Sequence, residues 1–342
     1  TLFHLAAAHL ANIQVARGEL GAARQTHEQA LVEAKSIGEP VSPLVALSHA
    51  GIGALRYEWN DLAAAEQHFN EGMAHARLWD QWESLVHLTL GRAHLKQRAG
   101  ETQAALQILD ELNSPPLEGM DLPLRAYAAR LSEPYSASAW LASNLTEDFL
   151  KPKPTSEAYL LDVARLMDSL HARDDALALI QRLIQFAEDG GRRHTLIRAK
   201  VALAMVGDVP EALVQALQLA EPEGYISTFV DEGEPMQNLL RHLLKQSRLE
   251  PRLCAYVERL LGAFEPSRRQ SMQAGGLIEP LSERELEVVR YIAEGLSNHE
   301  IASRLYLSPN TLKAHTQNIF VKMGVHSRLQ AVNKAKELGL IE

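Results

Sequence analysis

The 342 residues carry 34 Lys and Arg against 43 Asp and Glu, and 46% of them are hydrophobic. This composition is that of an ordinary globular chain long enough for two or three domains. The sequence has no apolar run of membrane-spanning length and no signal pattern, which predicts a cytoplasmic protein without a membrane partner. With Cys254 as its single cysteine, it excludes a disulfide framework and a thiolate metal cluster.

The charge is distributed unevenly along the chain. Residues 281–342 hold 8 basic and 7 acidic side chains, whereas residues 1–280 carry a net charge of −10. Only the C-terminal part is therefore suited to a polyanion such as DNA. The chain begins at Thr1 without a methionine, inside a helical pattern. We expect it to be a piece of a longer protein.

Residues 1 to about 220 show apolar residues at helical spacing, which predicts a series of helices. A short turn pattern of Gly or a polar residue followed by an acid recurs six times. The copies lie at 18–23, 60–65 and 100–105, with weaker ones at 132–133, 173–177 and 207–212. An acid ahead of a helix caps its first amides, so each copy is expected to join two helices of a pair. Such pairs stack as a solenoid.

The repeated region resembles tetratricopeptide-like superhelical repeats. A non-repetitive helical bundle is the alternative, because the steps between copies range from 32 to 42 residues. A further helix is predicted at about 253–264, after an acidic Glu-Pro-Glu-Gly-Tyr stretch that begins at Glu221. Residues 265–279 are polar, contain Gly-Gly and lack an apolar period, which predicts a linker. The expected domains are a repeat region at 1–264 and a DNA-binding domain at 280–342.

Four short helices are predicted after residue 280. Three helix starts have the capping-box spacing of Ser and Glu or Gln, at Ser282, Ser297 and Ser327. The fourth start is Ser308, a cap residue that a proline follows. The apolar stripes predict that Leu286, Val289, Ile292 and Ala293 of the first helix face inward, as do Ile301, Ala302 and Leu305 of the second. In the third helix Leu312, Thr316, Ile319 and Met323 are expected inside.

The second and third of these helices are separated by a three-residue turn, which is typical of a helix-turn-helix. Polar side chains that can read base edges, together with an alanine that can contact a thymine methyl, follow the predicted outer face of the third helix. The predicted base-reading residues are Asn310, Lys313, Ala314, Gln317 and Asn318. Between residues 301 and 336 there are six Lys or Arg and no acid. This window predicts a surface that faces DNA phosphates.

Hydroxyls near helix starts and long cations are typical phosphate contacts. The residues predicted for this role are Ser297, Ser308, Thr311, Lys322 and Arg328. The last helix carries a separate apolar stripe that we interpret as the contact between two copies. The stripe consists of Leu329, Val332, Ala335 and Leu338.

These residues also resemble the LuxR-type (GerE-like) DNA-binding domain. The matching motifs are Leu281-Ser282, Arg284-Glu285, Gly295-Leu296-Ser297-Asn298, Glu300-Ile301-Ala302, Thr311-Leu312-Lys313, His315, Lys322, Gly324-Val325, Arg328 and Gln330-Ala331-Val332. The resemblance implies a transcription regulator that binds two-fold promoter sites as a dimer, with RNA polymerase as a partner. It implies base readout from Lys313, Ala314 and Gln317.

The combination of helical repeats, the acidic stretch, a linker and this domain is similar to the large ATP-dependent MalT-like regulators. The similarity implies that a small-molecule or protein effector at the repeats promotes self-association and promoter activation. It places ATP in an upstream module, because the 342 residues contain no G-x-x-x-x-G-K-[ST] phosphate-binding loop. No cofactor is expected in this chain.

Fourteen histidines raise the question of a metal site. His68 and His75 lie on one helix face but two turns apart, too far to bind one ion together, and His87 and His94 share this spacing. His299 starts a zinc-protease pattern, but Ser303 stands where the second histidine is required. The sequence predicts no metal site and no enzyme.

The sequence therefore predicts an all-α transcription regulator, in which an effector at the repeats changes how two DNA-binding domains are presented. The alternative is a helical-repeat interaction scaffold whose C-terminal domain does not bind DNA. The cluster Tyr57, Trp59, Phe69, Trp79 and Trp82 could form a ligand groove, although packing between repeats is the favoured interpretation.

Overall fold

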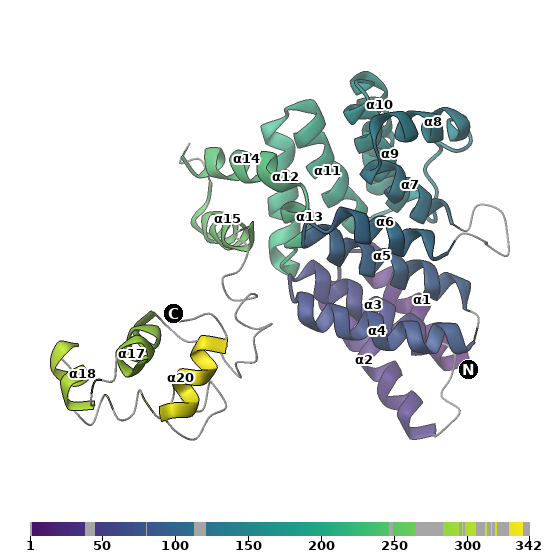
Figure 1. Cartoon of the computed structure of the whole chain (residues 1–342). Helices are drawn as coiled ribbons and strands as arrows, with labels where there is room; N and C mark the ends of the chain where they lie inside the picture. Colours follow the sequence, from purple (N-terminus) through teal and green to yellow (C-terminus); the bar gives the residue numbers. More distant parts are fainter. Residues whose placement is uncertain are drawn as a thin grey trace. The chain divides into compact units, whose positions relative to one another are not determined.

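The computed structural model describes residues 2–37, 45–79, 81–112, 121–245, 249–264, 283–293, 296, 298–305, 312, 316, 319 and 328–337. These residues form helices, turns and short connections and include no β-strand, so the fold is all-α as predicted (Figure 1). The chain divides into two compact units, Thr1–Phe264 and Glu265–Glu342. The predicted linker lies outside the described residues. None of the described helices has the length and apolar character needed to cross a membrane.

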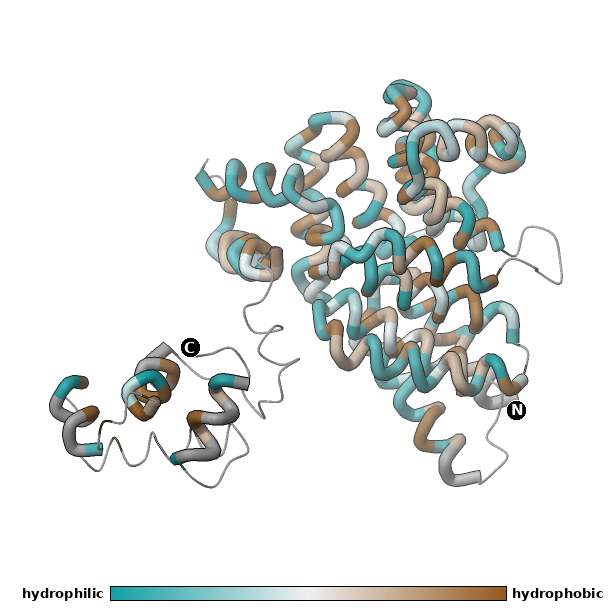
Figure 2. Tube along the Cα trace, viewed as in Figure 1, coloured by the Kyte–Doolittle hydropathy of each residue, from teal (hydrophilic) through white to brown (hydrophobic). Residues whose placement is uncertain are grey.

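Six helix pairs are described in the first unit, and the turns inside them fall at the six predicted positions or within two residues of them. Figure 2 shows hydrophobic and hydrophilic residues alternating along these helices, as expected when one face is buried. The pairs are α1 (Leu2–Ala16) with α2 (Leu20–Ile37), α3 (Val45–Glu58) with α4 (Leu62–Leu78), α5 (Trp82–Arg98) with α6 (Thr102–Asp110), α7 (Leu122–Leu131) with α8 (Pro134–Asn144), α9 (Glu157–Ser169) with α10 (Arg173–Asp189), and α11 (Arg193–Gly207) with α12 (Pro210–Ala220). This arrangement supports the tetratricopeptide-like interpretation.

The three strong copies of the turn pattern share one backbone geometry. Gly18, Asn60 and Gly100 adopt φ values of 76°, 62° and 78°. Gly and Asn tolerate this left-handed conformation, which ends a helix. In each turn the next residue's amide bonds to the carbonyl five residues back, as Asp61 N does to Arg56 O at 2.8 Å. Asp61 then caps α4 through its side chain, which accepts from the Ala64 amide at 3.4 Å.

The weaker copies of the turn pattern also separate two helices, but they use other residues or another backbone geometry. In the fifth pair the left-handed residue is His171, two residues before the predicted position, and in the sixth it is Asp208. Ser132, between α7 and α8, is extended instead, and Pro134 begins the next helix. Proline is favoured at the first helical position, so this turn needs no left-handed residue.

Three further helices follow the pairs: α13 (Ser227–Val230), α14 (Gly233–Lys245) and α15 (Pro251–Phe264). A short 3-10 turn, η1 (Glu221–Glu223), precedes them. One hydrophobic core joins this end of the unit to its beginning, and α1 contacts α11. Fully or almost fully buried members of that core include Ala11, Leu20, Leu55, Val201, Leu213, Phe229 and Tyr256. The first and last repeats are therefore held together.

The second unit contains α17 (Glu283–Ala293), α18 (Asn298–Arg304) and α20 (Arg328–Glu337). Each begins at the residue after a predicted cap serine, although the serines themselves lie outside the described residues. Ile301, Ala302 and Leu305 are buried as predicted. The stripe predicted for the first helix is wrong at its end, because Ala293 is exposed and Val288 is fully buried. Ala293 is the last residue of α17, whereas Val288 lies inside the helix and belongs to the core of the second unit, where α17 contacts both α18 and α20.

The packing of Phe69 generates a stability prediction. Its ring lies between Gly53 of α3 and Gly91 of α5, where an added Cβ would come within 2.5 Å and 2.3 Å of ring atoms. Gly91→Ala should therefore lower the free energy of unfolding by about 1–3 kcal/mol through overpacking. Urea unfolding of the whole chain, followed by circular dichroism, measures this change.

Gly262→Ala is the matched control for this substitution. Gly262 is an exposed position inside α15, and an added Cβ there meets no atom within 4 Å. Alanine should raise the free energy of unfolding by roughly 0.5–1 kcal/mol, because it has the higher helix propensity. Equal stability of Gly91→Ala and the wild type would contradict the proposed packing.

Candidate functional site

The predicted recognition helix is described at three positions, which form its inner face. Leu312, Thr316 and Ile319 are helical and buried, and the two apolar side chains belong to the core of the second unit. The Thr316 hydroxyl donates to the Leu312 carbonyl at 2.9 Å, so its polar atom is satisfied inside the helix. These three residues face inward, as their spacing predicts.

The predicted base-reading residues lie outside the described part of the chain, and their role stays a prediction. They are Asn310, Lys313, Ala314, Gln317 and Asn318. The same holds for four of the predicted phosphate contacts, namely Ser297, Ser308, Thr311 and Lys322.

Arg328, the fifth predicted phosphate contact, is half-buried at the start of α20. Its guanidinium donates to Asn298 Oδ1 at 3.1 Å and to the Leu296 carbonyl. The side chain thus ties α20 to the start of α18. A phosphate contact by Arg328 stays a prediction, and such a contact would share the guanidinium with these two hydrogen bonds.

The apolar stripe of α20 is partly used inside its own domain. Ala335 is fully buried in the core of the second unit, and Val332 is partly buried against it. The Ala335 side chain is therefore not available to a second copy. The side chains of Leu329 and Leu338 lie outside the described residues. The dimer contact through the rest of this stripe stays a prediction.

A second candidate site lies in the repeat unit, where the chain between α12 and α14 packs against earlier repeats. We call residues 221–232 the inserted segment. Glu58, the last residue of α3, receives three hydrogen bonds from it. The amides of Ile226 and Thr228 donate to Glu58 Oε1 at 3.1 and 2.9 Å, and the Thr228 hydroxyl donates to Oε2 at 2.9 Å. The Ile226 amide also reaches the Glu58 carbonyl at 2.9 Å.

The inserted segment is held at further points along α2 and α3. The Gly21 amide donates to Glu223 Oε2 at 3.0 Å, and Trp59 Nε1 donates to the Glu223 carbonyl at 2.9 Å. The Ser227 hydroxyl donates to the Tyr57 carbonyl at 2.6 Å. Residues about 170–200 positions apart in sequence are thus joined by hydrogen bonds to backbone atoms, which fixes the path of the segment.

The end of the inserted segment carries two acids that pair with arginines of different repeats. Asp231 accepts from the Tyr57 hydroxyl at 2.9 Å and pairs with Arg98 of α5. Glu232 pairs with Arg165 of α9, and both of these side chains are at most 13% exposed. The Arg165–Glu232 pair is therefore largely buried and costly to break, because the remaining charge would be left unpaired, whereas the Arg98–Asp231 pair is more exposed. The segment therefore links three repeats, through α3, α5 and α9.

Other charges lie near these pairs, and we call the whole group the interior polar cluster. It consists of Tyr57, Glu58, Arg98, Arg130, Asp162, Arg165, Arg198, Asp231 and Glu232. Removal from water raises the pKa of Glu58 to about 7, although the hydrogen bonds from Thr228 oppose this shift. Burial also raises the pKa of Asp231, against the opposing charge of Arg98. Burial lowers the pKa of the Arg198 guanidinium, and Arg165 adds to this effect.

Two partly buried histidines border the interior polar cluster. Burial lowers the pKa of His94 to about 4 and that of His194 to about 3. His94 stacks on Tyr57 with ring centroids 5.8 Å apart, and His194 Nδ1 lies 3.2 Å from the Tyr225 hydroxyl. Both rings are therefore neutral near pH 7 and add no charge to the interior polar cluster.

Sequence reasoning assigned no role to the charged members of the interior polar cluster. It singled out Tyr57 and Trp59 only as members of the aromatic cluster. Those two now have polar partners in the inserted segment, and Phe69 is buried in a repeat core. Trp79 is 41% exposed. The packing interpretation is therefore confirmed for Phe69, whereas Trp79 does not fit it.

Comparisons with known proteins agree with this architecture. The MalT-like TPR region family matches residues 1–246, and the luxR family of bacterial regulatory proteins matches residues 279–335. The HTH-type transcriptional regulators MalT of Yersinia pestis (strain Pestoides F) and Yersinia pseudotuberculosis serotype O:1b (strain IP 31758) are each 26% identical to this chain over 362 residues. The alignments cover 95% of this chain and 40% of each relative, so the chain spans about two fifths of their length.

The raised pKa of Glu58 predicts a specific pH dependence. An unfolded Glu titrates near 4.5 and folded Glu58 near 7, so the folded state binds the extra proton between these values. Stability from this group is complete below about pH 4.5 and is lost as the pH rises through 7. Glu58→Gln keeps an oxygen acceptor for the two amides but cannot ionise.

The stability of wild type relative to Glu58→Gln should therefore fall by roughly 3 kcal/mol between pH 4.5 and 7.5. Urea unfolding at a series of pH values gives this difference directly, and it cancels the opposing contribution of the buried histidines. Parallel stability curves for the two proteins would show that Glu58 does not titrate in this range.

Proposed function

The chain belongs to the MalT-like, LuxR-type regulators, and from this premise we propose that it binds promoter DNA through its C-terminal unit. Binding of a ligand or a protein to the repeat unit controls this activity. The observation that carries the proposal is the match of residues 279–335 to the luxR family, together with the acid-free window from 301 to 336.

DNA recognition would combine base contacts from the predicted outer face of the recognition helix with phosphate contacts around it. The inner face of that helix is anchored by Leu312, Thr316 and Ile319, which gives the base-reading positions a fixed support. A rigid element is needed because hydrogen bonds to base edges depend on geometry. Two copies would engage two half-sites, and RNA polymerase is the proposed partner at the promoter.

Control would act through the inserted segment, which continues directly into α14 and α15 and then into the region before the DNA-binding unit. A ligand that competes for its partners, or stabilises them, shifts the population between an inserted and a released segment. Arg198 is the proposed ligand-binding cation, since the described residues give it no ion pair within 4 Å. A ligand with acceptor oxygens would suit its guanidinium. ATP binding is proposed only for an upstream module.

Substitutions in the recognition helix test DNA binding. Lys313→Ala and Gln317→Ala should each remove about 1–3 kcal/mol of preference for the cognate promoter fragment, because one base contact is lost. Fluorescence anisotropy with fragments from the neighbouring genes measures this loss, with Lys245→Ala of the exposed surface of α14 as a control of equal charge. The logarithm of affinity should fall with the logarithm of salt by about 0.9 per phosphate contact.

The interaction scaffold without DNA binding makes the opposite prediction. It would show no preference among fragments, no salt slope and no effect of either substitution, and this set of results would overturn the proposed function.

Release of the inserted segment tests the control. Asp231→Ala removes the partner of Tyr57 and Arg98, so it should shift the population toward the released state. The DNA affinity of the whole chain should then change at least about fivefold, the lower limit of typical coupling between sites. Asp148→Ala is the matched control, because Asp148 forms an exposed ion pair with Lys153 in a loop of the same unit. An affinity unchanged by Asp231→Ala would exclude control by this segment.

A further inference from the structure

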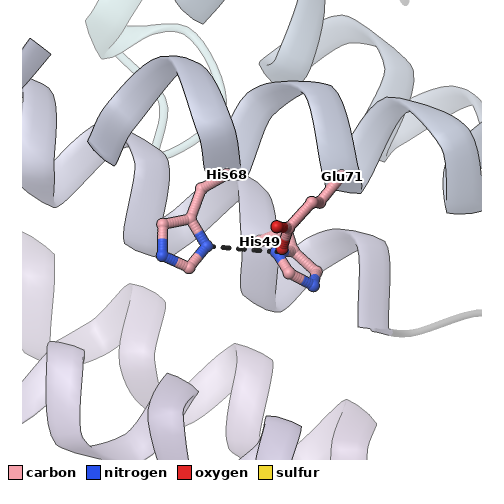
Figure 3. Close-up of side chains that lie close together, drawn as sticks. All are labelled: His49, His68 and Glu71. Atoms are coloured by element: carbon pink, nitrogen blue, oxygen red, sulfur yellow. Dashed lines mark hydrogen bonds and ion pairs between the residues drawn. The ribbon is translucent and has the colours of Figure 1, made fainter. Parts of the chain in front are cut away.

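The second helix pair brings together three potential metal ligands that the sequence did not connect. His49 comes from α3, and His68 and Glu71 come from adjacent turns of α4 (Figure 3). His49 Nδ1 lies 3.1 Å from His68 Nδ1 and 3.4 Å from Glu71 Oε2. All three ligand atoms lie within 4.8 Å of one another. The sequence paired His68 with His75 and therefore predicted no metal site.

These distances fit the edges of a coordination tetrahedron. At a metal–ligand distance of about 2.0–2.1 Å, two ligand atoms of a tetrahedral zinc site lie about 3.3 Å apart. The two measured distances to His49 Nδ1 are within about 0.2 Å of this value. The remaining gap, between His68 and Glu71, can close by rotation of the Glu71 side chain, which is 45% exposed. The two distances to His49 are thus already close to those of a bound zinc ion, and the distance between His68 and Glu71 can adjust.

The packing of α3 on α4 is what places the His49 ring. Gly72 lies next to Glu71 on α4, and a Cβ at this position would come within 2.9 Å of the His49 Cβ. The absence of a side chain lets the two helices approach closely here. His49 is only 8% exposed, and its ring stacks on His75 with centroids 5.9 Å apart. The least mobile ligand is therefore fixed before any ion binds.

The other two ligands have the support and the charge that a cation needs. Gln67 Nε2 donates to Glu71 Oε1 at 2.8 Å, which leaves Oε2 directed at His49. Such outer contacts orient metal ligands and raise affinity. Burial lowers the pKa of the His68 ring. Glu71, Glu28 and Asp61 contribute negative charge around it, opposed by Arg56.

We propose that His49, His68 and Glu71 form a zinc site that clamps α3 to α4. Two imidazole nitrogens and one carboxylate oxygen are a common donor set for Zn²⁺, with the fourth position left to water. Mg²⁺ and Ca²⁺ prefer oxygen ligands alone, which this site does not offer. Because the ion bridges two helices of one repeat, it stabilises the folded repeat unit by mass action.

Cobalt substitution tests the site on the whole 342-residue chain after chelator treatment. Titration with Co²⁺ should produce visible d–d absorption that saturates at one ion per chain, and Zn²⁺ should abolish it. His68→Gln and Glu71→Gln should lose this absorption while their circular dichroism stays that of the wild type. Both residues are at least partly exposed, so neither substitution removes a core side chain. Gln67→Ala should weaken binding about tenfold by freeing the Glu71 carboxylate.

His87→Gln is the matched control, because His87 is an exposed histidine of α5 whose Nδ1 lies 3.0 Å from the Glu83 carbonyl. It should bind Co²⁺ like the wild type. Zn²⁺ should also raise the thermal unfolding temperature of the wild type and of His87→Gln but not of His68→Gln. Absence of the d–d absorption in the wild type, or its persistence in His68→Gln and Glu71→Gln, would overturn the proposal. The two imidazoles would then share a simple N–H···N hydrogen bond.

Discussion

The fold of the repeat unit depends on the carboxylate of Glu58, which accepts hydrogen bonds from two amides and a hydroxyl of the inserted segment. A carboxylate that is withdrawn from solvent is stable only if other groups satisfy it, and here the satisfying groups come from a segment about 170 residues away. The interaction therefore has two consequences. It closes the first repeats onto the last, and it leaves an acid whose pKa lies near neutrality.

The ion pairs beside Glu58 extend the same constraint over the unit. A solenoid normally connects each repeat only to its neighbours, so distant repeats move with little coupling. Here Asp231 and Glu232 join arginines of α5 and α9, while Ser227 and Thr228 bind α3. Breaking one of these contacts would thus affect the packing of several repeats at once. This coupling is the property that a control element for a distant DNA-binding unit requires.

The C-terminal unit uses polar contacts for a different purpose. Arg328 connects α20 to the start of α18, and Thr316 satisfies its hydroxyl within the recognition helix. Both contacts stiffen the described part of a small domain. The proposed zinc site would also join two helices through polar groups. His49 of α3 and His68 of α4 meet where Gly72, which has no side chain, lets these helices approach closely.

The sequence alone determined the features that depend on residues up to five positions apart. The turns at Gly18, Asn60 and Gly100, the helix starts after Ser282 and Ser297, and the inner face of the recognition helix follow from turn composition, capping and helical periodicity. Ala293 was misplaced because periodicity along a helix does not show which of its positions neighbouring helices cover, and Ala293 is the last residue of α17. Only the tertiary structure decided that Glu58 meets Thr228 and that His49 meets His68 and Glu71. Such pairs depend on the crossing of helices and on the closure of the superhelix, which no spacing along the chain encodes.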